Sequence, residues 1–346
     1  MFHRKVYYRL KPFVPWSVRI TLRRWHAARI KRKHASTWPI NPAAAAVPPG
    51  WRGWPDGKRF ALVLTHDVEG RRGVESCQEL MDLEAKLGFR SCFNFVPEGD
   101  YSTPAELRNE LTANGFEVGV HDFRHDGKLY FSRAGFQAQA ERIKEYLKDW
   151  DAAGFRAGFM QHDLEWLHDI TPFYDASTFD TDPFEIQPEG VNTIFPFWVP
   201  LDASRREKTK ESGYMELPYT LPQDSTLFIV LREKSPMIWK QKLDWVAANR
   251  GMALLIVHPD YMRFKPGRCG SREYPAAFYE EFLRHVQHEY RGQYWMALPK
   301  EVAQYARQMS NTSAFAARPK ERPVPRLLSL VTACSAFSEQ FSYVIQ

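Results

Sequence analysis

Short apolar runs alternate with segments of helical periodicity between residues 60 and 309. The apolar runs are rich in β-branched and aromatic residues, which is typical of buried strands, and lie at 60–65, 89–96, 116–120, 155–159, 226–231 and 252–257. Apolar residues at helical spacing occupy 74–87, 136–152, 236–249, 276–290 and 300–309. Strands that alternate with helices in this way predict an α/β fold with a parallel sheet or barrel.

The two ends of the chain lack this alternation. Apolar residues and arginines are interleaved near the amino terminus, which permits a basic helix, and five prolines between 39 and 55 predict a linker. Helical periodicity is lost after residue 310. These features divide the chain into four parts: a basic arm (1–35), a proline-rich linker (36–55), an α/β domain (56–309) and a disordered tail (310–346).

Positive charge is concentrated in the arm and linker. The first 55 residues contain twelve lysines and arginines and no acidic residue, whereas the rest of the chain is net acidic despite the overall charge of +6. A basic helix of this kind favours peripheral contact with an anionic membrane over nucleic acid binding. A solvated arm, or one packed on the domain, is the alternative. If the arm and linker are separate from the domain, deletion of residues 1–50 leaves stability nearly unchanged.

The remaining composition points to a globular protein of a reducing compartment. Hydrophobic residues make up 44% of the chain, which is enough for a substantial core. The four cysteines, Cys77, Cys92, Cys269 and Cys334, are widely spaced and predict reduced thiols. No apolar run of membrane-spanning length and no standard secretory signal is evident, so a cytoplasmic location is expected, or the inner face of the membrane if the arm binds lipid.

Two carboxylates follow the first predicted strand. Asp67 and Glu69 are two residues apart, so strand alternation places both on one side of the chain. The carboxyl ends of strands are where α/β barrels carry their catalytic groups. A helix cap or a solvated surface pair is the alternative interpretation.

Four further polar residues lie at or just after strand ends. His121 and His125 follow the run at 116–120, and on a helical turn their spacing places both rings on one face, where they can bind one metal ion. His258 ends another apolar run, where it can act in proton transfer or simply cap the strand. Arg156 can orient a carboxylate or lower its pKa.

The order of these elements resembles that of the polysaccharide deacetylase family, also called the NodB-homology or carbohydrate esterase family 4 enzymes. That family has a T-F-D-D element, an H-x-x-x-H element, an R-x-P-Y element, an Asp-containing element and a late L-x-x-H element. The similar segments of this chain are 65–69, 121–125, 156–159, 174–177 and 255–258. The resemblance identifies the domain at 56–309 as a divergent deacetylase-like domain.

The resemblance implies a distorted (β/α) barrel of the glycoside hydrolase/deacetylase type, with about seven strands instead of the eight of a regular barrel. It implies Asp67 as the general base, Arg156 as its partner and His258 as the general acid. The backbone N–H near Phe159 would help to bind the oxyanion. A divalent metal, usually zinc in this family, would polarise the carbonyl and activate a water.

The resemblance also implies that His121 and His125 bind the metal, but the third ligand departs from the family pattern. Val68 stands where the family has its metal-binding aspartate. Some members are more similar to this chain because they have a D-x-D pattern, and Glu69 would then be the ligand, with Asp67 as the alternative. His66 replaces the family phenylalanine and Gly158 replaces the proline.

The expected function is that of a bacterial hydrolase acting on carbon–nitrogen bonds other than peptide bonds. It would remove N- or O-acetyl groups from a carbohydrate in a cell-wall, surface or lipid-linked glycan, with Zn²⁺ as the metal and no nucleic acid partner. One alternative is a hydrolase of small cyclic amides. Another is a catalytically inactive barrel that binds glycan, a hypothesis motivated by Val68 and Gly158.

Overall fold

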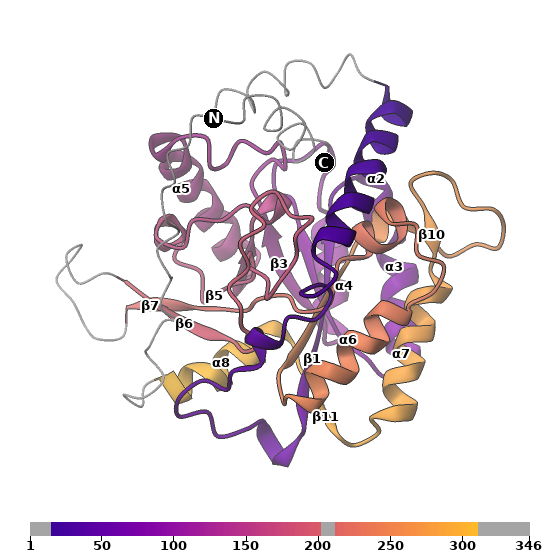
Figure 1. The fold of residues 1–346 in the computed structure, drawn as a ribbon. Helices are drawn as coiled ribbons and strands as arrows, with labels where there is room; N and C mark the ends of the chain where they lie inside the picture. The colour runs from indigo at the N-terminus through magenta and orange to yellow at the C-terminus, as the bar shows by residue number, and fades with distance from the viewer. Residues whose placement is uncertain (1–14, 202–211, 311–346) are drawn as a thin grey trace, which may run out of the picture.

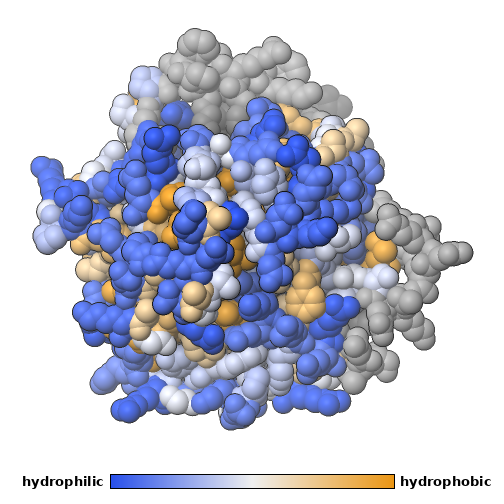
Figure 2. All heavy atoms as spheres, turned by 180° about the vertical axis from the view of Figure 1, so that it is seen from behind, coloured by the Kyte–Doolittle hydropathy of each residue, from blue (hydrophilic) through white to orange (hydrophobic). Residues whose placement is uncertain are grey.

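The computed structural model describes residues 15–201 and 212–310, and these form one α/β domain with an additional amino-terminal helix (Figure 1). The predicted tail from residue 311 onward and the first fourteen residues of the predicted arm lie outside the described residues. The face of the molecule shown in Figure 2 is largely hydrophilic with small apolar areas, as expected for a domain that buries most of its apolar side chains.

A curled parallel sheet is the centre of the fold. Its strands run in the order β8-β1-β2-β3-β4-β5-β7, and β6 pairs antiparallel with β7 at the edge. Backbone pairing of Leu221, beyond β7, with Leu255 of β8 brings the two sides of the sheet together. The strands are β1 (Phe60–Val68), β2 (Cys92–Phe95), β3 (Glu117–His121), β4 (Gly154–Arg156), β5 (Tyr174–Asp175), β6 (Phe197–Pro200), β7 (Gly213–Glu216) and β8 (Met252–Val257). The fold is therefore a distorted (β/α) barrel, as predicted.

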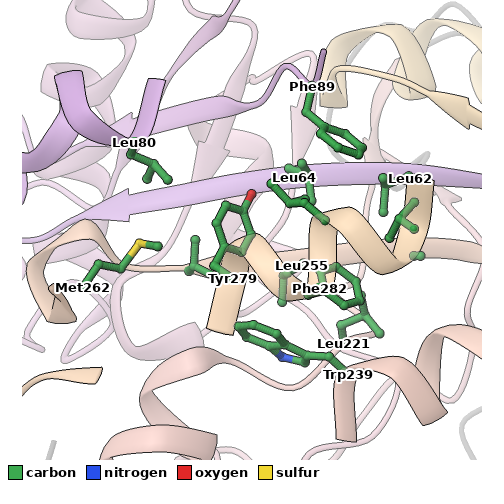
Figure 3. Close-up of a cluster of buried hydrophobic side chains, with 14 of the residues drawn as sticks. Leu62, Leu64, Leu80, Phe89, Leu221, Trp239, Leu255, Met262, Tyr279 and Phe282 are labelled. Carbon is green, nitrogen blue, oxygen red and sulfur yellow. The ribbon is translucent and has the colours of Figure 1, made fainter. Parts of the chain in front are cut away.

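Side-chain alternation along β1 separates two cores. Ala61 and Val63 point into the barrel, where they belong to a cluster that includes Met215 and Leu254. The intervening leucines of β1 face outward to the helices, and Figure 3 shows them beside Leu255, Trp239, Tyr279 and Phe282. Full burial of each such side chain contributes about 1.5–3 kcal/mol. Because β1 is buried on both faces, the same alternation directs its last inward residues, Thr65 and Asp67, to the carboxyl end of the barrel.

The predicted helices are present, with small differences at their ends. The helices are α2 (Trp16–Lys33), α3 (Arg71–Lys86), α4 (Ala105–Ala113), α5 (Arg133–Asp149), α6 (Met237–Ala248), α7 (Ala277–Glu289) and α8 (Pro299–Ser310). The pattern did not predict α4, because only Leu111 of its nine residues is buried and the apolar stripe is correspondingly weak. Six short strands were also not predicted: β5, β6 and β7 of the curled sheet, and β9 (Met262–Arg263), β10 (Tyr274–Pro275) and β11 (Tyr294–Met296).

The predicted strand at 226–231 is wrong. Residues Ser225–Val230 form η6, one turn of π-helix, which begins where the Asp224 side chain accepts a hydrogen bond from the Ser225 N–H. Five of its six residues are buried, so no alternation of apolar and polar positions marks it as helical or extended. A short run of this kind has the same composition in a buried strand and in a buried helical turn.

The segment predicted as a linker is packed into the domain. Trp38 is only 4% exposed and lies edge-on to Phe184, and Ala44, in the short helix η2 (Pro42–Ala45), is fully buried. The buried ammonium of Lys242 donates to the Pro39 carbonyl and to Asp180, at 2.5 Å each. Residues 38–44 therefore contribute to the core, although the domain boundaries themselves stay a prediction.

These contacts reverse the expected effect of truncation. Trp38→Ala is expected to lower the free energy of unfolding by about 3–5 kcal/mol, because it removes a buried aromatic ring. Deletion of residues 1–50 should destabilise the protein at least as much. Urea denaturation measures both, and Trp25→Ala is the matched control, because Trp25 is 54% exposed and its loss should change stability by less than about 0.5 kcal/mol. Equal stability of the two tryptophan variants, or a neutral deletion, would support the linker interpretation instead.

Candidate active site and metal centre

Three predicted metal ligands meet at the carboxyl end of the barrel. Glu69 follows β1, His121 is the last residue of β3, and His125 lies in the loop after it. One ligand atom of each of the three lies within 4.8 Å of the other two. Among the described residues this is the one set of three or more His, Cys, Asp and Glu side chains close enough to share an ion.

Hydrogen bonding and burial leave His121 suited to metal binding. His121 Nδ1 lies 3.1 Å from the Arg156 carbonyl oxygen, so Nδ1–H donates there and Nε2 carries the lone pair. His121 Nε2 is buried and has no hydrogen-bond partner among the described residues. Burial lowers the pKa of His121 to about 4, which keeps the ring neutral, the form that ligates metal. The residues present therefore fit a divalent metal with nitrogen and oxygen ligands, such as Zn²⁺.

The histidines come together by a different route from the one predicted. Residues 121–125 do not form a helical turn, because Asp122 and His125 both have positive φ angles, 56° and 52°. The backbone reverses instead, and the two rings lie with their centroids 4.9 Å apart. The ring of Phe159 stacks on His125 at 4.4 Å and limits its rotation. The two histidines lie close together, as predicted, but the predicted helical turn is wrong, and their role as metal ligands stays a prediction.

The turn at Gly158 leaves no room for a side chain. A Cβ atom on Gly158 would lie 2.3 Å from Asp122 Oδ2 and 2.9 Å from His125 Cδ2. The Asp122 carboxylate also accepts a hydrogen bond from the Gly158 N–H, which a proline would not supply. Glycine in place of the family proline is therefore part of how this chain positions His125.

Gly158→Ala is expected to weaken metal binding by about tenfold or more, because the new methyl group displaces His125 or its supporting carboxylate. Metal titration of the apoprotein measures the change. Gly270→Ala is the matched control, since its Cβ would be 3.6 Å or more from any neighbour. Equal metal affinity in the two variants would show that the close approach at Gly158 is absorbed without moving the ligand.

Glu69, and not Val68, faces the two histidines. Val68 points outward into the hydrophobic core, as alternation along β1 requires, whereas Glu69 points to the histidines. Glu69 Oε1 lies 3.1 Å from His125 Nε2, and Oε2 accepts a hydrogen bond from the Tyr261 hydroxyl at 2.9 Å. The Glu69 N–H donates to Asp260. Burial would raise the pKa of Glu69, but the His125 and His258 imidazoles more than offset it, so the carboxylate is ionised.

Asp67 is held by two donors deeper in the same end of the barrel. Arg156 Nη1 and Asn94 Nδ2 donate to Asp67 Oδ1 at 2.8 and 2.9 Å, and Arg156 also donates to the Thr65 hydroxyl. Oδ2 accepts no hydrogen bond from the described residues. Burial opposes ionisation, but the influences that favour the charged form, led by the Arg156 guanidinium, outweigh it and lower the pKa of Asp67 to about 2. Arg156 thus contacts Asp67 as the resemblance implies.

His258 is oriented by a residue that the sequence did not single out. Asp224 Oδ1 lies 2.6 Å from His258 Nδ1, and Asp224 Oδ2 accepts from the His258 N–H at 2.7 Å and from the Tyr274 hydroxyl. His258 Nε2 therefore faces the site, 3.7 Å from Glu69 Oε1. Burial lowers the pKa of His258, but Asp224 and Glu69 more than offset this and raise it to about 10, so the ring holds a proton.

The Asp-containing element assigned at 174–177 does not supply the aspartate that bonds to His258. Asp175 is fully buried, accepts hydrogen bonds from Ser177 and is hydrogen-bonded to Glu216. The aspartate that bonds to His258 is Asp224, which the predicted strand at 226–231 gave no reason to consider. Its one local signal is its position immediately before a serine and an apolar run, which is typical of a helix cap.

Among the comparisons with known proteins, one alignment with a solved structure supports this fold. No family model matches the sequence, and no curated protein matches it. A solved structure from Mycobacterium smegmatis, provisionally described as a polysaccharide deacetylase, aligns with a TM-score of 0.58 and 17% identity, over 81% of this chain and 98% of the other. A peptidoglycan deacetylase from Bacillus subtilis aligns at 0.42 and 12% identity, over 75% and 96% of the two chains. A chitin deacetylase from Colletotrichum lindemuthianum aligns at 0.31 and 16%, over 61% and 91%.

The barrel and the first of these alignments define the class: this chain has the fold of the polysaccharide deacetylases. The resemblance found in the sequence is confirmed at that level.

Proposed function

We propose that the protein is a divalent-metal-dependent carbohydrate deacetylase, with Zn²⁺ as its metal. The observation that carries the proposal is the convergence of Glu69, His121 and His125 at the end of the barrel where Asp67 and His258 also lie. A set of metal ligands alone could hold a structural metal. Here the ligands lie beside an ionised carboxylate, Asp67, and a protonated imidazole, His258, and such an arrangement fits hydrolysis.

The chain's own residues would divide the work in the following way. When bound, the metal supplies Lewis acidity toward the acetyl carbonyl oxygen. Asp67, held by Arg156, takes a proton from the water whose oxygen attacks the carbonyl carbon. His258, held by Asp224, gives a proton to the amine or alcohol as its bond to the acetyl carbon breaks, and acetate is released. The backbone N–H near Phe159 would help to stabilise the oxyanion.

The inactive-barrel hypothesis loses its main support. It rested on Val68 at the position of the metal-binding aspartate, and Glu69 now supplies a carboxylate to the two histidines. Gly158 likewise has a structural reason, the close approach of Asp122 and His125. Both departures from the family pattern are therefore compatible with an active site.

Acetate release tests the proposal directly. The purified full chain, loaded with Zn²⁺, is incubated with N- and O-acetylated oligosaccharides and with acetylated peptidoglycan fragments, and free acetate is measured. The expected result is turnover of at least one acetylated glycan that Asp67→Asn abolishes and that chelation removes reversibly. Stoichiometric zinc without acetate release from any glycan would favour the glycan-binding barrel, and ring opening of a cyclic amide would favour the amide hydrolase.

A further inference from the structure

Helix α2 is fixed to the domain by one face. Ile20 and Ala27 are each 3% exposed, and the Arg24 guanidinium donates to the Ile229 carbonyl at 2.9 Å. Lys31 forms an ion pair with Glu233 at 2.6 Å. These four residues follow one another at intervals of three or four, so they share one side of the helix. Helix α2 packs against η6. Figure 1 shows this helix at the upper right of the described part of the molecule.

The opposite face of α2 presents apolar side chains to solvent. Val18 is 47% exposed, Leu22 50% and Trp25 54%, and their spacing places them in one stripe along the helix. They are three of the five large apolar side chains that are exposed in the described part of the chain. Arg29 continues the stripe and lies over the Trp25 ring, with Cζ 3.5 Å from its centroid.

Exposed positive charge lies at the carboxyl end of this stripe. Helix α2 contains seven lysines and arginines and no acidic residue, and the exposed Arg32 and Lys33 lie in its last turn. An exposed Trp and Leu among basic residues match a lipid interface, where apolar side chains enter the acyl boundary and cations meet anionic head groups. A nucleic acid would use the charge but leave the apolar stripe without a partner.

We propose that the outer face of α2, with Val18, Leu22 and Trp25 as its apolar anchor, docks the protein on an anionic membrane surface. The helix lies parallel to the membrane, because its inner face is fixed to the barrel along its length. This places the membrane on the side of the barrel that carries η6. Asp224, the N-cap residue of η6, bonds to His258. None of the described helices is long and apolar enough to span a membrane, so the contact is peripheral.

Vesicle sedimentation tests this proposal with the full chain. Vesicles of phosphatidylcholine and phosphatidylglycerol at a 7:3 molar ratio are compared with pure phosphatidylcholine vesicles, at physiological salt and at about 0.5 M, where the Debye length is roughly halved. The protein is expected to sediment with the anionic vesicles alone, and less so at high salt. Leu22→Glu with Trp25→Glu should weaken binding at least tenfold for each side chain removed from the interface.

Val47→Glu is the matched control, because Val47 is 57% exposed but lies beyond the helix, two residues after η2. The Val47→Glu variant should bind vesicles like the wild type. Both it and the Leu22/Trp25 variant should keep the wild-type zinc content, because a loss of zinc would reveal a folding defect. Equal binding of the Leu22/Trp25 variant and the control overturns the proposal. So does a concentration-dependent dimer that the Leu22/Trp25 variant abolishes without any vesicle binding, or salt-sensitive binding to DNA that this variant leaves unchanged.

Discussion

Glu69→Gln is expected to lower the zinc affinity of the protein by roughly 100-fold or more, since loss of a direct ligand should exceed the 10–100-fold typical of losing a residue that only supports a ligand. The reason is geometric. Among the residues that the structure describes, Glu69 is the one carboxylate whose oxygen lies with the two imidazole nitrogens in the ligand cluster, and the Tyr261 hydroxyl already holds its other oxygen. A neutral amide keeps the shape but removes the charge that offsets the ion.

The comparison with Asp67→Asn makes this result specific. Asp67 is bonded to Arg156 and Asn94 and lies outside the three-residue cluster, so its amide variant should retain zinc and lose turnover. Metal competition titration of the two variants measures the difference. Glu233→Gln is the control, because Glu233 is 28% exposed against 23% for Glu69 and pairs only with Lys31 among the described residues. Loss of zinc in Asp67→Asn with normal binding in Glu69→Gln would exchange the two roles.

The sequence predicted those parts of the structure that depend on local pattern. Strand β8 was predicted with its observed bounds, because residues 252–257 form an unbroken apolar run between a glycine and a histidine. The six predicted site residues also came together, since parallel strands deliver their last inward residues to the same end of a barrel. For β1 this follows from alternation alone, because Val68 faces the core and Asp67 faces the interior.

What the sequence did not predict depends on contacts between distant segments. Asp224 acquires its role only because the chain beyond β7 returns to pair with β8, 34 residues farther along the sequence. Trp38 and Ala44 stand in a proline-rich segment whose composition is that of a linker, and their burial depends on partners such as Phe184 and Ile194. The positive φ angles at Asp122 and His125 have no signature in the pattern of apolar residues.

His258→Ala is expected to reduce turnover by roughly 10²–10⁴-fold while zinc stays bound, because removal of a general acid leaves the ligands in place. His258 Nε2 is 3.7 Å from Glu69 Oε1, close enough to serve the same substrate without belonging to the ligand cluster. Asp224→Asn should give a smaller loss of turnover with normal zinc content, because it weakens the orientation and the protonation of the ring without removing it. Replacing Asp224 also lowers the pKa of His258, since its charge is the largest influence that raises this pKa.

The pH dependence of turnover separates a general acid from a residue that only shapes the site. With Asp224 intact, the high pKa of His258 places the alkaline decline of the rate at high pH, and Asp224→Asn should move that decline to lower pH because the ring loses its proton sooner. His288→Ala, at an exposed position, should leave both rate and profile unchanged. Loss of zinc in His258→Ala would make His258 a ligand. An unchanged rate in that variant would make it a strand cap, and the release of the leaving group would then need another proton donor.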